Sequence, residues 1–373
     1  MNCPRVDVDL WKIRHNTRVV VERLKTRNIQ VTAVSKAVCG HPAIARAMFN
    51  GGAAGLADAR LSNVQRLRQA GMTCPITLIR TPMLSQADVV VQICEASYNT
   101  EMVVISALAA AALRYKTVHG IILTVEMGDL REGIMPQEVA CMAQRVVALP
   151  GVALKGIGAN FACLSGIAPT PAKMQVLSDL ANDVEEQCGP YLQTVSGGNS
   201  TTLPWALNGS STGRINDLRI GEAILLGVDP VTGNRIDGLY RDAVTLVAEV
   251  IETDAKSVGP LVDQTDPALA RIHLVSDTTG TMRLIFALGH QDTDATGLTM
   301  PPGHTFVGAT SDHLVIGTKD PTLRVGSEMR FQMNYSALMR AMAAPDTQIN
   351  THNDLPRPKP RDARRPNNRL ALV

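Results

Sequence analysis

A lysine follows directly on a short apolar stretch near the start of the chain. Residues 31–34, Val-Thr-Ala-Val, are typical of a buried β-strand, and Ser35 and Lys36 come next. Desolvation beside a protein core favours the neutral amine of a lysine, the form that attacks an aldehyde to give a Schiff base. The position also fits a lysine whose charged end simply reaches past the strand into solvent. Lys36 is therefore a candidate nucleophile that needs support from other residues.

Two glycine-containing segments could hold a phosphate group. Residues 196–200 (Ser-Gly-Gly-Asn-Ser) and residues 221–222 (Gly-Glu) each join a predicted strand to helical residues. Glycine lets the backbone approach a ligand closely, and N–H groups at the start of a helix suit an anion. Either segment alone could be an ordinary tight turn, and Arg131 and Arg219 could be surface ion-pair residues. Two such segments after neighbouring strands are more informative, because barrels often bind phosphate there.

These residues fall where the strands of an alternating pattern are predicted to end. Short β-branched runs alternate with helix-patterned stretches between about residues 8 and 230. Eight such strands predict a (β/α)₈ TIM barrel, whose chemistry lies at the C-terminal ends of its strands. A doubly wound sheet is the alternative, but no Gly-x-Gly-x-x-Gly segment follows the first strand. The predicted strands are Ile29–Val34, Ala54–Ala57, Ile76–Ile79, Ala96–Tyr98, Gly120–Val125, Leu154–Ala159, Gln193–Val195 and Asn216–Arg219.

The pattern changes after about residue 235, where strand-length runs are separated by Gly, Pro and Asp without long helical stretches. This predicts a C-terminal antiparallel β domain. We expect the barrel over residues 8–232, the β domain over residues 1–7 and 233–344, and a disordered tail over residues 345–373. The tail is expected because that segment is rich in Pro, Arg, Asn and Asp.

Composition excludes several classes of function. The chain has 373 residues, a net charge of +2 and only 3% aromatic residues, which argues against nucleic-acid binding. Seven cysteines without a Cys-x-x-Cys pair are typical of a reducing compartment. The first residues have no apolar signal-peptide region, and the most apolar window is shorter than a bilayer span of about 20 residues. We therefore expect a cytoplasmic protein with no membrane partner.

Segments along the chain resemble the motifs of one enzyme family, in the family's order. The family is the alanine racemase-like (fold type III) pyridoxal phosphate enzymes, and the resemblance is greatest to its ornithine racemase branch. It runs from about Val6 to Met342 and covers both domains. The matching segments are Val34-Ser35-Lys36-Ala37, Glu126–Gly133, Ala159–Ala162, Asn199-Ser200, Arg219–Ala223, Ser311–His313 and Asn334-Tyr335.

The resemblance implies how the ring of pyridoxal 5′-phosphate is bound. Lys36 would carry the cofactor as a Schiff base and then act as one proton-transfer base. Arg131 would hold the phenolic oxygen, and Asn160 would lie against the ring. Arg219 would hydrogen-bond the pyridine nitrogen and, being always protonated, would keep that nitrogen unprotonated. Such a ring is a weaker electron sink, which would limit side reactions while allowing α-proton exchange.

The resemblance also assigns the phosphate site. Asn199 and Ser200 match the family's Asn-Ser pair, and Gly221 and Glu222 would contribute backbone amides. Tyr335 would be the phosphate-contacting tyrosine of the second domain. One departure concerns this site, because Cys39-Gly40-His41 stands where alanine racemases have a further tyrosine that touches the phosphate.

A second departure concerns the base opposite the lysine. Alanine racemases supply a tyrosine from the partner subunit's β domain, but the corresponding residues 257–262 (Ser-Val-Gly-Pro-Leu-Val) contain none. Racemisation needs a proton-transfer group on each face of the α-carbon, or one base that reaches both. We expect His313 or Cys163 to be the second catalytic group and Asp312 to bind the substrate, and the fold implies a homodimer with shared active sites.

The substrate is expected to be ornithine or another basic amino acid, whose distal ammonium group Asp312 or Asp292 could pair with. An alanine or broad-specificity racemase stays open. So do a D-amino-acid aldolase or dehydratase and a non-catalytic pyridoxal phosphate-binding protein. The aldolase and dehydratase relatives bind a metal through a His-x-Cys pair, whereas residues 333–335 here are Met-Asn-Tyr, so no metal is expected.

Overall fold

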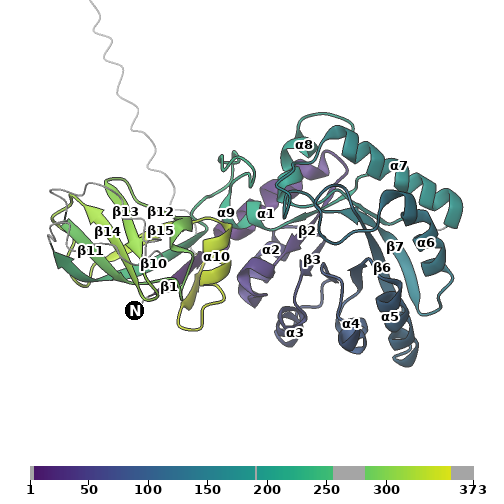
Figure 1. The fold of residues 1–373 in the computed structure, drawn as a ribbon, viewed down its shortest axis with the longest axis horizontal. Coiled ribbons are helices and arrows are strands. Elements are labelled where there is room, and N and C mark those ends of the chain that lie inside the picture. Colours follow the sequence, from purple (N-terminus) through teal and green to yellow (C-terminus); the bar gives the residue numbers. More distant parts are fainter. Residues whose placement is uncertain (1–3, 190, 255–281, 354–373) are drawn as a thin grey trace, which may run out of the picture.

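The computed structural model describes residues 4–189, 191–254 and 282–353. It has two lobes, a ring of strands and helices and a smaller lobe built mainly of strands (Figure 1). Residues 255–281 belong to the predicted β domain and include the tyrosine-free segment 257–262. They lie outside the described residues, as does the end of the chain from residue 354.

The larger lobe is a closed barrel of eight parallel strands, in which β9 pairs with both β8 and β2. The (β/α)₈ prediction is confirmed, and each of the eight predicted strands overlaps an observed one. The strands are β2 (Gln30–Val34), β3 (Gly55–Asp58), β4 (Ile76–Leu78), β5 (Ala96–Asn99), β6 (His119–Val125), β7 (Val152–Ala159), β8 (Thr194–Ser196) and β9 (Asp217–Ile220).

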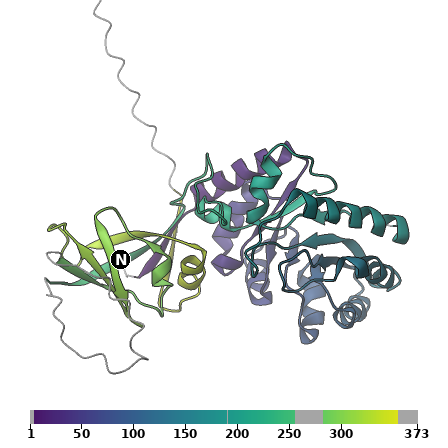
Figure 2. The same ribbon diagram turned by 45° about the horizontal axis from the view of Figure 1, so that its top comes forward.

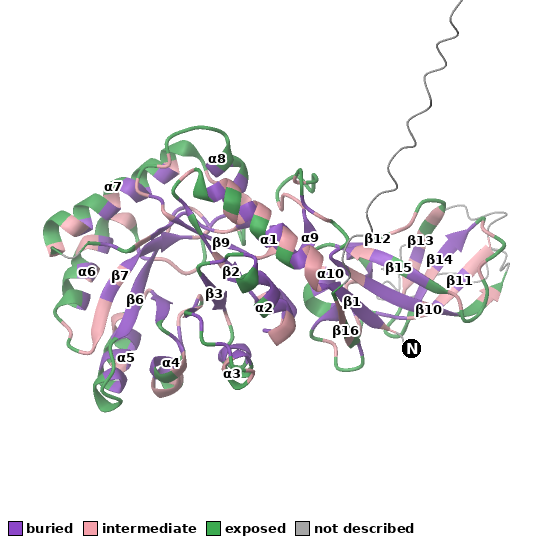
Figure 3. Ribbon diagram, turned by 180° about the vertical axis from the view of Figure 1, so that it is seen from behind, coloured by how far each residue is buried: buried purple, intermediate pink, exposed green. Residues whose placement is uncertain are grey.

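Helices surround the barrel, with their buried faces toward the strands and their exposed faces outward (Figure 3). Asp9 caps the first of them, because its carboxylate accepts hydrogen bonds from the backbone N–H groups of Trp11 and Lys12. The α-helices are α1 (Leu10–Lys25), α2 (Pro42–Asn50), α3 (Leu61–Gln69), α4 (Ala87–Ile93), α5 (Met102–Arg114), α6 (Val139–Val147), α7 (Pro171–Cys188), α8 (Leu203–Leu207) and α9 (Glu222–Leu226). Short 3₁₀ helices are η1 (Lys36–Val38), η2 (Leu84–Gln86), η3 (Pro136–Glu138) and η4 (Ser200–Thr202).

Glycine is required where β7 meets β8. A Cβ atom on Gly156 would lie 1.9 Å from the carbonyl oxygen of Thr194, closer than real Cβ atoms come to backbone. Gly156 pairs with Thr194 in the parallel ladder, so the two strands approach at this point more closely than a side chain allows.

The smaller lobe is an eight-stranded sheet, mainly antiparallel, that joins both ends of the described chain. Its first strand precedes the barrel, and the others follow it (Figure 2). The elements are β1 (Arg5–Asp9), β10 (Val244–Asp254), β11 (Met282–Ala287), η5 (Ala295–Gly297), β12 (Leu298–Thr299), β13 (His304–Ala309), β14 (His313–Thr318), β15 (Glu328–Met333), α10 (Tyr335–Ala341) and β16 (Gln348–His352).

Strand β16 corrects the expected tail. Residues 345–373 were predicted to be disordered, but Gln348–His352 pair in parallel with β1 over five residues. The reason is that β1 offers a free edge, and the segment contains the β-branched residues Ile349 and Thr351. The composition of the segment does not predict this strand, because the strand with which it pairs lies more than 300 residues away in the chain.

Helix α10 brings the two lobes together beside Lys36. Tyr335 begins this helix, and the Lys36 Nζ atom lies 5.9 Å from the centroid of its ring. Asn334 caps the helix by accepting a hydrogen bond from the backbone N–H of Ala337. In the described ranges, the structure contains no helix that is long and apolar enough to cross a membrane.

Candidate active site

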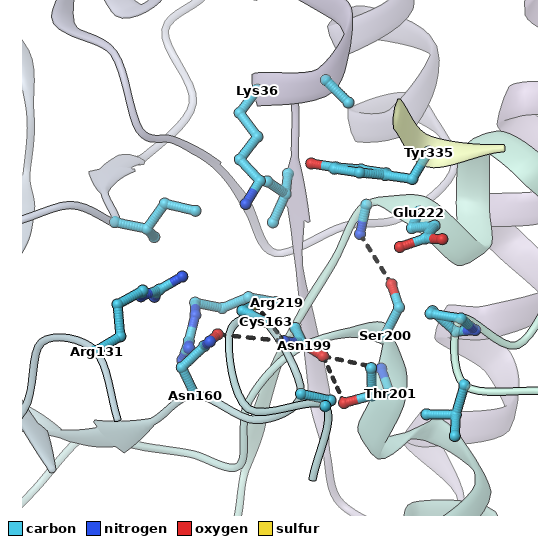
Figure 4. Close-up of a pocket in the computed structure, with 18 residues that line it drawn as sticks. Lys36, Arg131, Asn160, Cys163, Asn199, Ser200, Thr201, Arg219, Glu222 and Tyr335 are labelled. Atoms are coloured by element: carbon cyan, nitrogen blue, oxygen red, sulfur yellow. Dashed lines mark hydrogen bonds between the residues drawn. The ribbon is translucent and has the colours of Figure 1, made fainter. Parts of the chain in front are cut away.

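A pocket of about 520 Å³ opens at the C-terminal ends of the barrel strands and is closed on one side by Tyr335. This is the size of an ordinary small-molecule site. Figure 4 shows the Lys36 amine and the Tyr335 ring near one another, with Arg131 and Asn160 across the pocket. The polar residues that line it are Lys36, Arg131, Asn160, Cys163, Asn199, Ser200, Thr201, Arg219, Glu222 and Tyr335.

The turn after β2 presents Lys36 to the pocket. Ser35, buried at the end of the strand, donates a hydrogen bond from Oγ to Asp58 Oδ2 at 2.7 Å. Asn63 Nδ2 donates to the other oxygen of Asp58 at 3.0 Å. Gly40 has a φ of +60°, and a Cβ atom there would lie 2.7 Å from Asn63 Cβ. Asp58 and Gly40 therefore fix the turn that carries the lysine.

Cys39, Gly40 and His41 complete this turn without reaching the pocket lining, which among the described residues includes none of the three. Cys39 adopts a left-handed conformation with a φ of 51°, and His41 stands at the N-cap of α2.

Asp129 ties the loops after β6 and β7 together. Asn160 Nδ2 donates to Asp129 Oδ2 at 2.8 Å, and the backbone N–H groups of Cys163 and Leu164 donate to Oδ1 at 2.9 and 3.0 Å. Burial acts to raise the pKa of Asp129, but these donors outweigh it and hold the pKa below its usual value. An ionised Asp129 thus holds Asn160 in the pocket and lies 3.9 Å from the guanidinium of Arg131.

The loop after β8 contributes Asn199 and Ser200. Asn199 caps η4 through its side-chain oxygen and donates from Nδ2 to Asn160, to the carbonyl of Phe161 and to Cys163 Sγ. Ser200 Oγ accepts hydrogen bonds from the backbone N–H groups of Gly221 and Ala223 at 3.4 and 3.2 Å. The two glycine-containing segments singled out in the sequence therefore meet at one place.

Arg219 forms part of the pocket's buried floor. Its guanidinium lies 4.6 Å from the centroid of the Tyr98 ring and donates to Tyr98 Oη, Ser196 Oγ and the Ala159 carbonyl at 3.1, 2.6 and 2.7 Å. Only 7% of the residue is exposed. Three hydrogen bonds and the neighbouring Tyr98 ring hold the guanidinium in place.

Glu222 is the one carboxylate among the described residues that line the pocket. Burial raises its pKa to about 7, the positive charge of Lys36 acts against this increase, and Asp229 adds to it. Burial also raises the pKa of Tyr335, and the neighbouring Glu222 contributes to that increase. The Tyr335 hydroxyl is therefore protonated at neutral pH and can donate a hydrogen bond.

The structure does not bring every predicted site residue to this pocket. Asp292 and Asp312 lie on two loops of the smaller lobe, and His313 begins β14 directly after the second loop. A hydrogen bond from His290 N to the Thr310 carbonyl joins the two loops. Asp312 and His313 are exposed, and neither they nor Asp292 line the pocket of their own chain. Of the two predicted second bases, Cys163 lines the pocket and His313 does not.

Sequence reasoning missed three buried carboxylates that support pocket residues: Asp58, Asp129 and Asp217. Asp58 ends β3, and Asp217 stands two residues before Arg219 on β9. An acidic residue at the C-terminal end of a predicted barrel strand was a usable signal for the first. Asp129 lies within the segment Glu126–Gly133, from which only Arg131 was assigned a role, so no pattern pointed to it.

The chain is similar to known proteins along most of its length. Residues 8–230 match the family model described as alanine racemase, N-terminal domain. The chain is 35% identical to a lysine racemase of Thermotoga maritima over 92% of this chain and 96% of that protein. It is 29% identical to an ornithine racemase of Acetoanaerobium sticklandii over 91% of this chain and 97% of the relative. The alanine racemase structure from Streptomyces coelicolor superposes with a TM-score of 0.73 at 19% identity, covering 94% of this chain and 98% of that one.

Proposed function

The chain belongs to the alanine racemase family and is an amino-acid racemase, and we propose that it uses pyridoxal 5′-phosphate to interconvert the enantiomers of a basic amino acid. The observation that carries the cofactor proposal is the donor set of the pocket. Lys36, Arg131, Arg219, Ser200 and the Tyr335 hydroxyl surround a single cavity, which suits an anionic aromatic ligand.

The residues fit the two ends of that ligand. Tyr335, Ser200 and the backbone N–H groups near Gly221 would hold the phosphate, and Lys36 would carry the aldehyde carbon on Nζ. Arg219 would face the ring nitrogen, and Arg131 would face the phenolic oxygen. Bound pyridoxal phosphate supplies a conjugated ring that draws electrons from the α-carbon and so makes its hydrogen acidic.

Lys36 is the proposed proton carrier on one face of the α-carbon. Its Nζ atom lies over the Tyr335 ring, which covers it from the side of the smaller lobe.

Arg131 is fixed from outside the pocket, because its Nε and Nη2 atoms donate to Glu132 at 2.5 and 2.7 Å. Arg131 also lines the pocket, where its charge would orient the ligand.

Cys163 is the proposed acid or base on the opposite face within one chain. Its thiol lines the pocket and accepts a hydrogen bond from Asn199 Nδ2 at 3.3 Å. His313 would serve only if a second copy of the chain brings its smaller lobe against this pocket. The exposure of Asp312 and His313 supports such a homodimer, in which Asp312 and Asp292 bind the substrate in the neighbouring site.

A basic substrate is supported by the two relatives named lysine racemase and ornithine racemase. The acidic residues at hand are Glu222 inside the pocket and the Asp292–Asp312 pair on the smaller lobe. A carboxylate that pairs with a distal ammonium group would distinguish lysine or ornithine from alanine.

Incubation of the holoenzyme with single enantiomers in D₂O tests the function. We expect L- and D-ornithine and L- and D-lysine to lose optical activity and to gain one deuterium at the α-carbon, and alanine to react more slowly. Cleavage or ammonia release with retained chirality would show an aldolase or a dehydratase instead. Bound cofactor without any exchange would show a non-catalytic binding protein.

A further inference from the structure

Strand β9 carries two buried charged side chains two positions apart, Asp217 and Arg219. Alternate residues of a strand point to the same side, and both side chains line a cavity inside the barrel. Asp217 is only 2% exposed. Of the two, Arg219 also lines the pocket described above, so this arginine belongs to both spaces.

Ser196 of β8 connects the two charged groups. Arg219 Nη1 donates to Ser196 Oγ at 2.6 Å, and Ser196 Oγ donates to Asp217 Oδ2 at 2.6 Å. Thr32 Oγ1 donates to the other carboxylate oxygen, also at 2.6 Å. A guanidinium can only donate, so the serine oxygen accepts from it and directs its own hydrogen to the aspartate. The hydrogen bonds thus run in one direction, from the pocket floor to Asp217.

The surroundings of Asp217 are polar, although a barrel interior is usually filled by apolar layers. The inner cavity measures about 160 Å³, room for several water molecules of roughly 30 Å³ each. Burial raises the pKa of Asp217, while the Ser196 and Thr32 hydroxyls and the charge of Arg219 act in the opposite direction. The polar side chains that line the cavity are Gln30, Thr32, Thr77, Tyr98, Thr194, Asp217 and Arg219.

We propose that Asp217 is a positioning residue that acts through Ser196 to fix the orientation of Arg219 and to balance its charge at the pocket floor. The inference rests on the proposed function, because Arg219 faces the ring nitrogen only if pyridoxal phosphate occupies the pocket. A buried guanidinium without a compensating acid is costly, and Asp217 supplies that acid one hydroxyl away. Without Asp217 to accept its hydrogen bond, the Ser196 hydroxyl could rotate. Its oxygen would then no longer be held in place to accept the hydrogen bond from Arg219.

Three substitutions in the holoenzyme test the inference. Asp217→Asn keeps the shape and removes the charge, Ser196→Ala cuts the connection, and Thr32→Val removes only the hydroxyl that does not reach Arg219. We expect kcat to fall about tenfold in the first two variants with KM changed less than threefold, an effect typical of a lost supporting contact. Loss of a negative charge also disfavours nearby protonation, so the pH midpoint of the bound cofactor's absorption change moves down in Asp217→Asn. Thr32→Val stays close to the wild type in both readouts.

A folded Asp217→Asn holoenzyme with the wild-type spectrum, pH profile and kcat overturns the inference, even if its thermal stability is lower. If that variant does not fold, Ser196→Ala decides by the same readouts, because it removes a single hydroxyl. Measuring the wild type under the same conditions shows whether a negative result concerns the role of Asp217 or the proposed function itself. A wild type that binds no pyridoxal phosphate or exchanges no α-hydrogen overturns the function itself, whereas a normal wild type with unchanged variants overturns only the role of Asp217.

Discussion

Carboxylates outside the pocket hold side chains that lie inside it. Asp58 supports the turn of Lys36, Asp129 supports Asn160, and Asp217 supports Arg219 through Ser196. Each acid is 5% exposed or less, so its hydrogen bonds work in a low dielectric, where they fix geometry well. At the scale of single residues, buried carboxylates accept the hydrogen bonds that hold the pocket's polar side chains in position.

Lys36→Ala tests the residue on which the function depends. We expect the variant to lose the visible absorption band that borohydride abolishes in the wild type, and to lose racemase activity by about three orders of magnitude or more. Lys155→Ala is the control, since Lys155 lies on β7 and bonds Gln193 at the surface. A Lys36→Ala protein that keeps the band would show that another amine carries the cofactor.

Glu222 makes folding stability depend on pH. Burial raises its pKa from the ordinary value of 4.5 to about 7 in the folded chain, the charge of Lys36 acts against this increase, and Asp229 adds to it. The folded state therefore binds an extra proton in this window, and stability falls as pH rises from about 4.5 to 7. Without pyridoxal phosphate, Glu222→Gln should match the wild type near pH 5 and be more stable by about 1–2 kcal/mol near pH 8.

Urea unfolding of both proteins at the two pH values measures this difference. Comparing wild type with variant at each pH cancels the contribution of every other titrating group. A stability difference that does not change with pH would contradict a raised pKa at Glu222.

At the scale of elements, the barrel depends on close contact between β7 and β8. Gly156→Ala would place a methyl group 1.9 Å from the Thr194 carbonyl oxygen, so the two strands must separate. We expect a loss of about 3 kcal/mol or more in the free energy of unfolding, measured with urea. Gly308→Ala in β13 is the control, because no heavy atom lies within 4 Å of its added Cβ. Equal stability of the two variants would contradict this account.

Elements whose partners are near in sequence could be predicted, and those with distant partners could not. The eight barrel strands show in the hydrophobic pattern, because each one alternates with its own helix. Lys36, Arg131 and Ser200 could be singled out for the same reason, since they stand just after these strands or in the loops that follow them. β16 and the contact between Tyr335 and Lys36 depend on residues about 300 positions apart, which no local pattern records. Tyr335 was assigned to the site through the family resemblance alone.

At the scale of the whole molecule, the exposed Asp312 and His313 predict that two copies share their sites. Lys36→Ala and the double variant Asp312→Ala/His313→Ala should each be inactive as homodimers. Random mixing during refolding or co-expression gives about half heterodimers, each with one complete site. We therefore expect about a quarter of wild-type activity in the mixture. A fully active double variant, or a mixture that stays inactive, would argue that each chain works with its own residues.

The pairing of β1 with β10 and β16 has a consequence for biosynthesis. The ribosome makes β1 first, yet its two neighbours in the sheet, residues 244–247 and 348–352, emerge only after the whole barrel. The barrel can close while synthesis continues, since its strands β2–β9 pair only with one another. During that time β1 waits with both edges unpaired, a condition that invites association with other chains. The smaller lobe is thus completed last, and with it the Tyr335 side of the pocket, so a nascent chain acquires a barrel before it acquires a finished site.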